Sequence, residues 1–248
     1  EARSRTNLDL PGLQQEFLEE IYKVNPNIVL VLNNGRPLTI SWAAEKIPTI
    51  VEAWQLGTAT GNAVAQVLYG DYNPSGKLPM SFPRNIGQVP ISYNHYITGR
   101  FTNKDNNVFW SHYSDVEKTP LYPFGYGLSY TTFEYSNLKI NKKSFPKGEK
   151  IEVSVDLKNT GKVTGKEVAQ LYLQDEFASV VRPVKELKGF EMIELQPNES
   201  KKVVFTIDEK TIEFYTANAK WEAEAGDFKV FVGGSSAQTL QADFQFAQ

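Results

Sequence analysis

The spacing of apolar residues changes partway along the chain. Up to about residue 80 it alternates between helical and strand periods, which is typical of the βα units of a parallel sheet. Asp9 is a candidate cap for a first helix that ends at Asn25-Pro26. The continuous apolar run Ile28–Leu32 then predicts a strand covered on both faces. The predicted inward stripe of the first helix consists of Leu13, Phe17, Ile21 and Val24.

A second βα pair follows. Thr49–Trp54 predicts another strand, and Gly61–Tyr69 predicts another helix that Gly70 terminates. The residues expected to face inward on this helix are Ala63, Val64, Val67 and Leu68. The βα alternation stops after this helix.

Residues 71–130 are rich in Pro, Gly, Asn and aromatic side chains, with turn signals at Asn73–Gly76. Disordered segments are poor in aromatic rings, so we expect an ordered connection that carries long loops. Its rings are expected to bury large areas or to meet a ligand. They include Tyr93, Tyr96, Phe101, Phe109, Trp110 and Tyr113.

From about residue 131, short alternating segments recur between turns such as Asn159–Lys162 and Gln196–Glu199, which predicts an all-β sandwich. The predicted strands are Phe133–Ile140, Ile151–Leu157, Val168–Leu173, Glu186–Leu195, Lys202–Ile207 and Phe228–Val232. The expected fold class is therefore α/β, a partial sandwich sheet with flanking helices, followed by a β-sandwich. A length of 248 residues also favours two cores. The expected domains are 1–95 and 131–248, joined by the connection 96–130.

The composition of the chain limits the kinds of partner and of catalytic chemistry that it can support. A net charge of -3 and the lack of a Lys/Arg-rich run argue against nucleic-acid or membrane partners. No stretch approaches the roughly twenty apolar residues that a spanning helix needs. The absence of cysteine removes thiolate chemistry, and His95 and His112 lack a nearby acidic cluster with ligand spacing, so no metal is expected. Catalysis would therefore depend on carboxylates.

Two segments resemble known functional motifs but lack residues that those motifs require. Gly70–Leu78 superficially has the pattern of a phosphate-binding loop, but it follows a helix, its glycines are wrongly spaced, and Leu78 replaces the hydroxyl residue. Gly127–Tyr130 begins like a nucleophile elbow, yet Thr131 stands where the second glycine belongs. Nucleotide binding and serine hydrolysis are therefore rejected.

Several strings occur together and in order, and they carry a resemblance. They are Glu1–Arg5, Leu10–Gln14, Val31–Pro37, Gly70–Pro79 and Tyr122–Tyr130. Together they closely resemble family 3 glycoside hydrolases, especially bacterial periplasmic β-glucosidases. Arg182–Glu191 is similar to the fibronectin type III-like domain that these enzymes carry at the carboxyl end. The resemblance covers nearly the whole chain.

The resemblance implies a retaining, exo-acting β-glycosidase that acts on β-linked oligosaccharides or glycosides from the non-reducing end, without a cofactor, in the periplasm or outside the cell. In that family an amino-terminal barrel supplies an aspartate nucleophile, and the α/β sandwich domain supplies an acid/base glutamate. Nothing in this sequence matches the barrel. The chain is thus expected to be the carboxyl-terminal part, to lack the nucleophile, and to be inactive alone.

Glu1 is the candidate general acid/base, because the family's carboxylate lies just before the Leu-Pro-Gly helix start. The alternative is a surface glutamate at a chain terminus, with the acid/base residue upstream. Arg3 and Arg5 are expected to be solvated cations. The sequence identifies no substrate-binding residue.

Three further groups of residues each have a structural interpretation beside a functional one. Asn33 and Asn34 would follow a buried strand on the side where α/β sheets bind ligands, but they also fit a turn. Trp110, Tyr113 and Tyr96 could form a sugar platform, although core packing is favoured. Asp71 and Lys77 are assigned to a turn held by side-chain hydrogen bonds.

Another class of function also fits the missing nucleophile. A noncatalytic carbohydrate-binding or scaffold module would need no barrel, whereas a protein-interaction sandwich is disfavoured because the loop strings match a hydrolase. If a barrel is missing, the α/β part should expose an apolar patch that promotes association.

Overall fold

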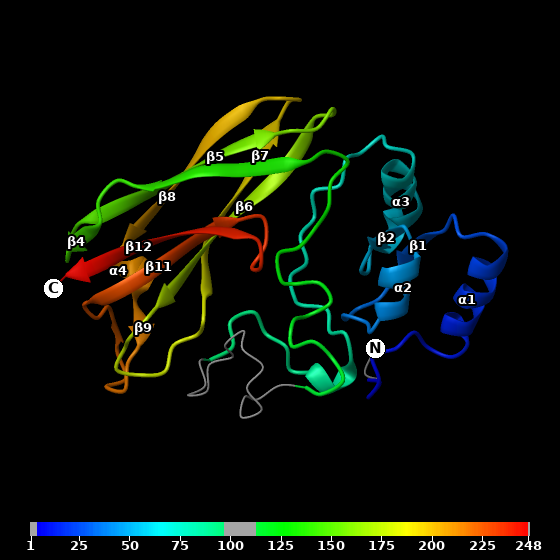
Figure 1. Ribbon diagram of the computed structural model, residues 1–248, viewed down its shortest axis with the longest axis horizontal. Helices are drawn as coiled ribbons and strands as arrows, with labels where there is room; N and C mark the ends of the chain where they lie inside the picture. Colours follow the sequence, from blue (N-terminus) through cyan, green and yellow to red (C-terminus); the bar gives the residue numbers. More distant parts are fainter. Residues whose placement is uncertain (1–3, 97–112, 248) are drawn as a thin grey trace. The chain divides into compact units, whose positions relative to one another are not determined.

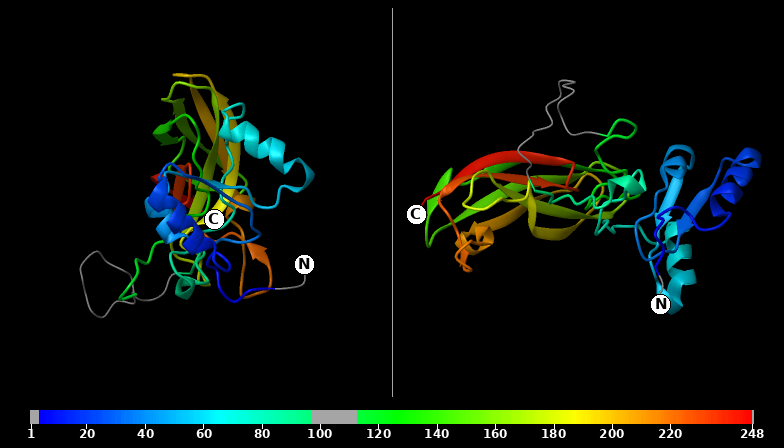
Figure 2. Two further views of the ribbon diagram at one scale, coloured as in Figure 1. Left: turned by 90° about the vertical axis from the view of Figure 1, so that its right-hand side faces the viewer. Right: turned by 90° about the horizontal axis from the view of Figure 1, so that it is seen from below.

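The computed structural model describes residues 4–96 and 113–247 (Figures 1 and 2). These residues form two compact units between which the chain passes several times. The first unit is the described part of Glu1–Tyr72, Met80–Ile91 and His112–Pro123; the second is that of Asn73–Pro79, Ser92–Ser111 and Phe124–Gln248. The first unit is α/β and the second is a β-sandwich, which confirms the predicted fold class.

The first unit is built around a parallel pair of strands. The strands β1 (Val29–Leu32) and β2 (Thr49–Glu52) run in register, from Val29 opposite Thr49 to Leu32 opposite Glu52. The parallel pairing confirms the predicted βα pattern. The helices of this unit are α1 (Gln14–Val24), α2 (Ser41–Lys46) and α3 (Thr60–Leu68), and its short 3-10 turns are η1 (Gly57–Ala59) and η2 (Ile86–Gln88).

The side chains of helix α1 that face the interior of the unit are not the predicted ones. Leu18 is buried, and Tyr22 makes an edge-on ring contact with Trp42 at 5.6 Å between centroids. The predicted stripe is wrong: Ile21 is half-buried, but Leu13, Phe17 and Val24 are exposed. The helix is apolar on two faces, and the sequence periodicity matched the outer one. The Asp9 cap is also wrong, because the cap position is Leu13 and Asp9 bonds elsewhere.

The other elements of the first unit are also incompletely covered. In β1 only Leu32 is buried and Val29 is exposed, so the expected cover on both faces is not present. In α3 the expected inward residue Leu68 is exposed, while Ala63, Val64 and Val67 are half-buried. Gly70 follows α3 with a φ of 82°, which glycine adopts without steric cost, as predicted for a helix end. Of the helices that the structure describes, none is long and apolar enough to cross a bilayer.

The second unit is a sandwich of two main sheets. One has the order β4-β12-β11-β6-β7 and the other β3-β5-β8, while β9 and β10 form a small hairpin. The larger sheet consists of β4 (Ser144–Pro146), β12 (Thr239–Ala247), β11 (Gly226–Gly233), β6 (Gly165–Asp175) and β7 (Glu186–Leu195). The remaining strands are β3 (Phe133–Ile140), β5 (Lys150–Asn159), β8 (Ser200–Asp208), β9 (Phe214–Tyr215) and β10 (Trp221–Glu222), with one helix, α4 (Glu209–Ile212). All six strands predicted for this region are present.

Alternation along the strands builds the core of the sandwich. In β5 every second residue from Ile151 to Leu157 is buried, and β8 does the same from Val203 to Ile207. Side chains of a strand point alternately to opposite faces, so both sheets present apolar faces to each other. The cluster also includes Phe145, Leu171, Val230 and Phe244.

Candidate functional site

Polar side chains lie at the carboxyl ends of both parallel strands in the first unit. Asn34 follows β1 and donates from Nδ2 to Glu52 Oε2 at the end of β2, at 3.4 Å. Its Oδ1 atom is buried and has no hydrogen-bond partner. Ligands of open α/β sheets bind outside the carboxyl ends of the strands. Asn34 therefore bonds across the predicted ligand edge, whereas Asn33 is exposed there.

Glu52 holds the turn that follows β2. Its Oε1 accepts a hydrogen bond from the Trp54 backbone N–H at 3.0 Å. Trp54 has a φ of 48°, a backbone conformation that costs a bulky residue on the order of 1–3 kcal/mol and that clusters at functional sites. Burial raises the pKa of the Glu52 carboxyl, against the lowering effect of the bonds from Trp54 and Asn34. This carboxylate is half-buried and accepts two bonds, so it can also accept one from a hydroxyl group.

Sequence reasoning did not single out Glu52. The signal was present, since a carboxylate follows the apolar pair Ile50-Val51 at the end of the strand. The same turn places the Trp54 ring 6.1 Å from Phe82, and Phe82 lies 6.1 Å from Tyr122. The polar strand ends are thus backed by a cluster of rings.

The loop after β1 holds the amino-terminal segment. Arg36 donates from Nη1 to the Arg5 carbonyl at 2.8 Å and from Nη2 to Ser4 Oγ at 3.4 Å. Further along the loop, Thr39 donates its N–H to the Leu8 carbonyl at 2.9 Å, and its hydroxyl bonds Asp9. The bond from Thr39 is the main cause that lowers the pKa of Asp9. Residues 4–9 are therefore fixed beside the carboxyl end of β1.

The predicted site residues are placed as follows. Glu1 and Arg3 lie outside the described residues, and so do Phe101, Phe109, Trp110 and His112. Arg5 is exposed, as expected for a solvated cation, and it also donates to the Asp9 carbonyl at 2.6 Å. Tyr113 in the first unit bonds the Gly87 carbonyl at 3.3 Å, whereas Tyr96 in the second unit forms an isolated bridge with Pro183. The sugar-platform role of these rings stays a prediction.

Lys77 is part of a buried ion pair in the second unit. Its Nζ lies 2.9 Å from Glu167 Oε2 and also donates to the Gly127 carbonyl at 3.2 Å. Tyr135 donates its hydroxyl to Glu167 at 2.9 Å, and burial, followed by the charge of Glu167, raises the tyrosine pKa. These bonds attach the turn that contains Lys77 to β6.

The same turn is held by a second side chain, Asn73. Its Oδ1 accepts from Ser129 Oγ and from the Tyr130 N–H, both at 2.8 Å, and its Nδ2 donates to the Thr164 carbonyl at 2.9 Å. Ser129 therefore holds this turn: within the described part of the chain it bonds Asn73 and the Thr131 N–H, not a histidine. The predicted structural role of Lys77 agrees with this geometry, and among the described residues Asn73 makes the side-chain bonds that were expected of Asp71.

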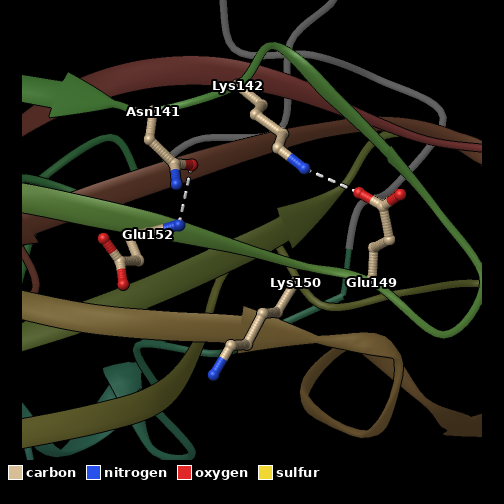
Figure 3. Close-up of a pocket in the computed structure, with 5 residues that line it drawn as sticks. All are labelled: Asn141, Lys142, Glu149, Lys150 and Glu152. Carbon is tan, nitrogen blue, oxygen red and sulfur yellow. Dashed lines mark hydrogen bonds and ion pairs between the residues drawn. The ribbon is translucent and has the colours of Figure 1, made fainter.

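A surface hollow of about 400 Å³ lies in the second unit, and two bonds link residues that line it (Figure 3). Lys142 pairs with Glu149 at 2.7 Å, and Asn141 accepts the backbone N–H of Glu152 at 2.9 Å (Figure 3). These bonds join the strands β3 and β5 near their turn. The hollow gathers no set of groups suited to catalysis.

The two units together define a class of protein in which an α/β body with polar strand ends is combined with a β-sandwich. The chain belongs to glycosyl hydrolase family 3: residues 1–130 match the Glycosyl hydrolase family 3 C-terminal domain, and residues 167–236 match the Fibronectin type III-like domain. This confirms the resemblance found in the sequence.

Similar proteins support the same assignment. A periplasmic beta-glucosidase of Salmonella typhimurium is 48% identical over 246 residues, which are 99% of this chain and 32% of that protein. A beta-xylosidase of Formosa agariphila is 45% identical over 95% of this chain and 32% of its own length. The crystal structure of a beta-glucosidase from Listeria innocua in complex with glucose matches 97% of this chain and 34% of that one, with a TM-score of 0.91 and 40% identity. The chain thus spans about a third of the length of these relatives.

Proposed function

We propose that this chain is the carboxyl-terminal portion of a retaining β-glycosidase of the β-glucosidase class. The enzyme removes sugars from the non-reducing ends of β-linked oligosaccharides or glycosides, and it acts in the periplasm or outside the cell. Support comes from relatives named beta-glucosidase and beta-xylosidase that match nearly all of this chain, one of them periplasmic.

Glu1 acts in this proposal as the general acid/base. The observation that carries it is the anchoring of residues 4–9 beside the carboxyl end of β1 by Arg36 and Thr39. Glu1 precedes Ser4 by three residues, and such a stretch spans about 10 Å at most. The proposal therefore assigns the Glu1 carboxyl to the edge where α/β sheets bind ligands.

The chemistry needs a second carboxylate. In a retaining mechanism a nucleophile forms a glycosyl intermediate, while the acid protonates the departing oxygen and later takes a proton from water. We assign the nucleophile to the barrel that the family resemblance implies, and we expect the isolated chain to be inactive.

The exposed apolar side chains of the first unit support the proposal that a further polypeptide segment covers it. Helix α1 exposes Leu13, Phe17 and Val24 on one face, and Val29 is exposed on β1. Exposed aliphatic and aromatic side chains on adjacent elements mark surfaces that another protein segment covers. The barrel-bearing polypeptide is the proposed occupant.

The test is reconstitution of hydrolysis. This chain is combined with a polypeptide that carries a family 3 barrel, and release of nitrophenol from nitrophenyl β-glucoside and β-xyloside is measured. We expect activity only in the mixture, and a loss of about 10²–10⁴-fold for Glu1→Gln. Glu45→Gln, at an exposed glutamate on α2, is the matched control and should retain activity.

Leaving-group dependence sharpens the assignment. A dinitrophenyl leaving group needs little protonation, so Glu1→Gln should slow glycosylation much less with this aglycone than with nitrophenol. An equal loss with both aglycones would remove Glu1 as the acid. Binding of sugars with no activity in any mixture would instead identify a noncatalytic module.

A further inference from the structure

The hairpin of β9 and β10 exposes an aromatic pair on the second unit. Trp221 lies opposite Tyr215, with ring centroids 5.8 Å apart and an interplanar angle of 63°. Trp221 is 67% exposed and Tyr215 is 56% exposed. Two large aromatic side chains exposed side by side form an apolar patch, so the pair is a candidate binding surface.

The register of the hairpin explains the outward position of the rings. Phe214 and Thr216 flank Tyr215 in the chain and are buried, and alternation directs Tyr215 to the opposite face. The Arg182 guanidinium lies 4.4 Å from the centre of the Phe214 ring. The inward residues anchor the hairpin, so the outward rings are not needed to bury its core.

The turn between the two strands is tightly bonded. Thr216 donates its N–H to the Lys220 carbonyl at 2.8 Å and receives the Ala219 N–H on its own carbonyl at 3.0 Å. The Thr216 hydroxyl also bonds the Lys220 carbonyl at 3.2 Å. The backbone that carries both rings is therefore fixed before a ligand arrives, and little entropy is lost on binding.

We propose that Tyr215 and Trp221 form a binding site for a neutral β-glycan chain, separate from the hydrolytic site. Pyranose rings present C–H groups to aromatic faces. The exposed turn residues Asn218 and Lys220 supply groups that hydrogen-bond sugar hydroxyls. The site would keep a β-glycan chain bound to the enzyme that hydrolyses its ends.

Charge and size select this ligand among the alternatives. Between residues 213 and 224 the chain has three glutamates and one lysine, which disfavours nucleic acids and other polyanions. Two rings on a hairpin are also far smaller than the roughly 800 Å² per partner of a stable protein interface. Helix α1 offers the aliphatic surface that a protein would need, whereas aliphatic groups do not stack on sugars.

The class of sugar rests on the proposed function, but the site does not depend on hydrolysis. The experiment uses this chain in native gels cast with mixed-linkage β-glucan, laminarin or xylan, together with a titration against soluble laminarin. We expect retardation in at least one of these gels. Trp221→Ala should weaken affinity about tenfold and Tyr215→Ala about threefold.

Phe190→Ala is the matched control, because Phe190 on β7 is also 67% exposed. The affinity of this variant for the glycan should not change. Thermal unfolding of each variant verifies folding, and Trp221→Phe should recover part of the binding. Absence of retardation for the parent chain with all three glycans would overturn the site, and so would equal behaviour of Trp221→Ala and Phe190→Ala. The site is likewise overturned if Trp221→Ala weakens only association with a barrel polypeptide.

A failure of this proposal is distinguishable from a failure of the proposed function. In the reconstituted mixture, Trp221→Ala should leave hydrolysis of nitrophenyl β-glucoside unchanged and slow only the degradation of the polymer. Loss of activity on the small substrate would contradict a separate site.

Discussion

The two units differ in how completely they cover their own apolar side chains. The sandwich has a closed cluster of buried residues from both sheets, including Ile151, Leu157 and Val232. The α/β unit has a two-stranded sheet, and its first helix leaves Phe17 67% exposed while it buries Leu18. A closed core covers its own apolar side chains, whereas the outer apolar face of helix α1 is left uncovered by the described residues of its own unit.

The strongest test of the closed unit concerns its buried ion pair. Glu167→Ala leaves the Lys77 ammonium buried with the Gly127 carbonyl as its recorded acceptor, and we expect a loss of about 3–5 kcal/mol in unfolding free energy. Urea denaturation followed by circular dichroism measures it. Glu194→Ala removes the exposed partner of Lys166 and should cost about 1 kcal/mol or less. Equal losses would show that the pair is not important for the sandwich.

A smaller effect is expected from the carboxyl of Asp175. Its Oδ2 lies 3.7 Å from Arg182 Nε, and neither buried atom has a hydrogen-bond partner. Burial raises the pKa of Asp175 to about 6, although Arg182 opposes the shift. Because the folded pKa is raised, this group contributes its full stability below the ordinary value of 3.8 and loses it as pH rises to about 6.

The Asp175→Asn variant tests this dependence. It should be more stable than the parent at pH 7, by on the order of 1–2 kcal/mol after allowance for solvent screening. The difference should shrink as pH falls from 6 to 4, and urea denaturation across this range measures it. A difference independent of pH would contradict the assignment of the shift to Asp175.

The smallest effect on stability is expected on the open unit. Phe17→Ser changes an exposed side chain and should alter the unfolding free energy by about 0.5 kcal/mol or less. It should nevertheless reduce self-association of the chain, measured by light scattering against concentration. Phe190→Ser, equally exposed on the sandwich, should leave association unchanged. A monomeric parent chain would show that the open unit needs no cover.

Sequence periodicity predicted the sandwich better than the α/β unit for a physical reason. The strand Ile151–Leu157 was predicted within β5, where every second residue is buried, because period-two alternation has one solution when one face is buried. Helix α1 offered two apolar faces, and periodicity cannot say which one the neighbouring elements cover. The short strands Phe214–Tyr215 and Trp221–Glu222 are too brief to carry a period.

The candidate site was predictable only in part. The position of Asn34 at a strand end followed from its place after an apolar run, but its bond to Glu52 needed the parallel register. The role of Glu1 was drawn from family resemblance and stays a prediction. The boundaries proposed at 95/96 and 130/131 also stay a prediction.

The buried Lys77 has a consequence for dissecting the protein in the laboratory. Residues 73–79 belong to the sandwich unit although they are flanked in sequence by α/β residues. An expression clone that begins after residue 123 would omit them, so Glu167 would lose its cation and Thr164 the amide of Asn73. No single cut yields both units intact, and an isolated sandwich would need residues 73–79 supplied as a separate peptide or grafted through a new linker.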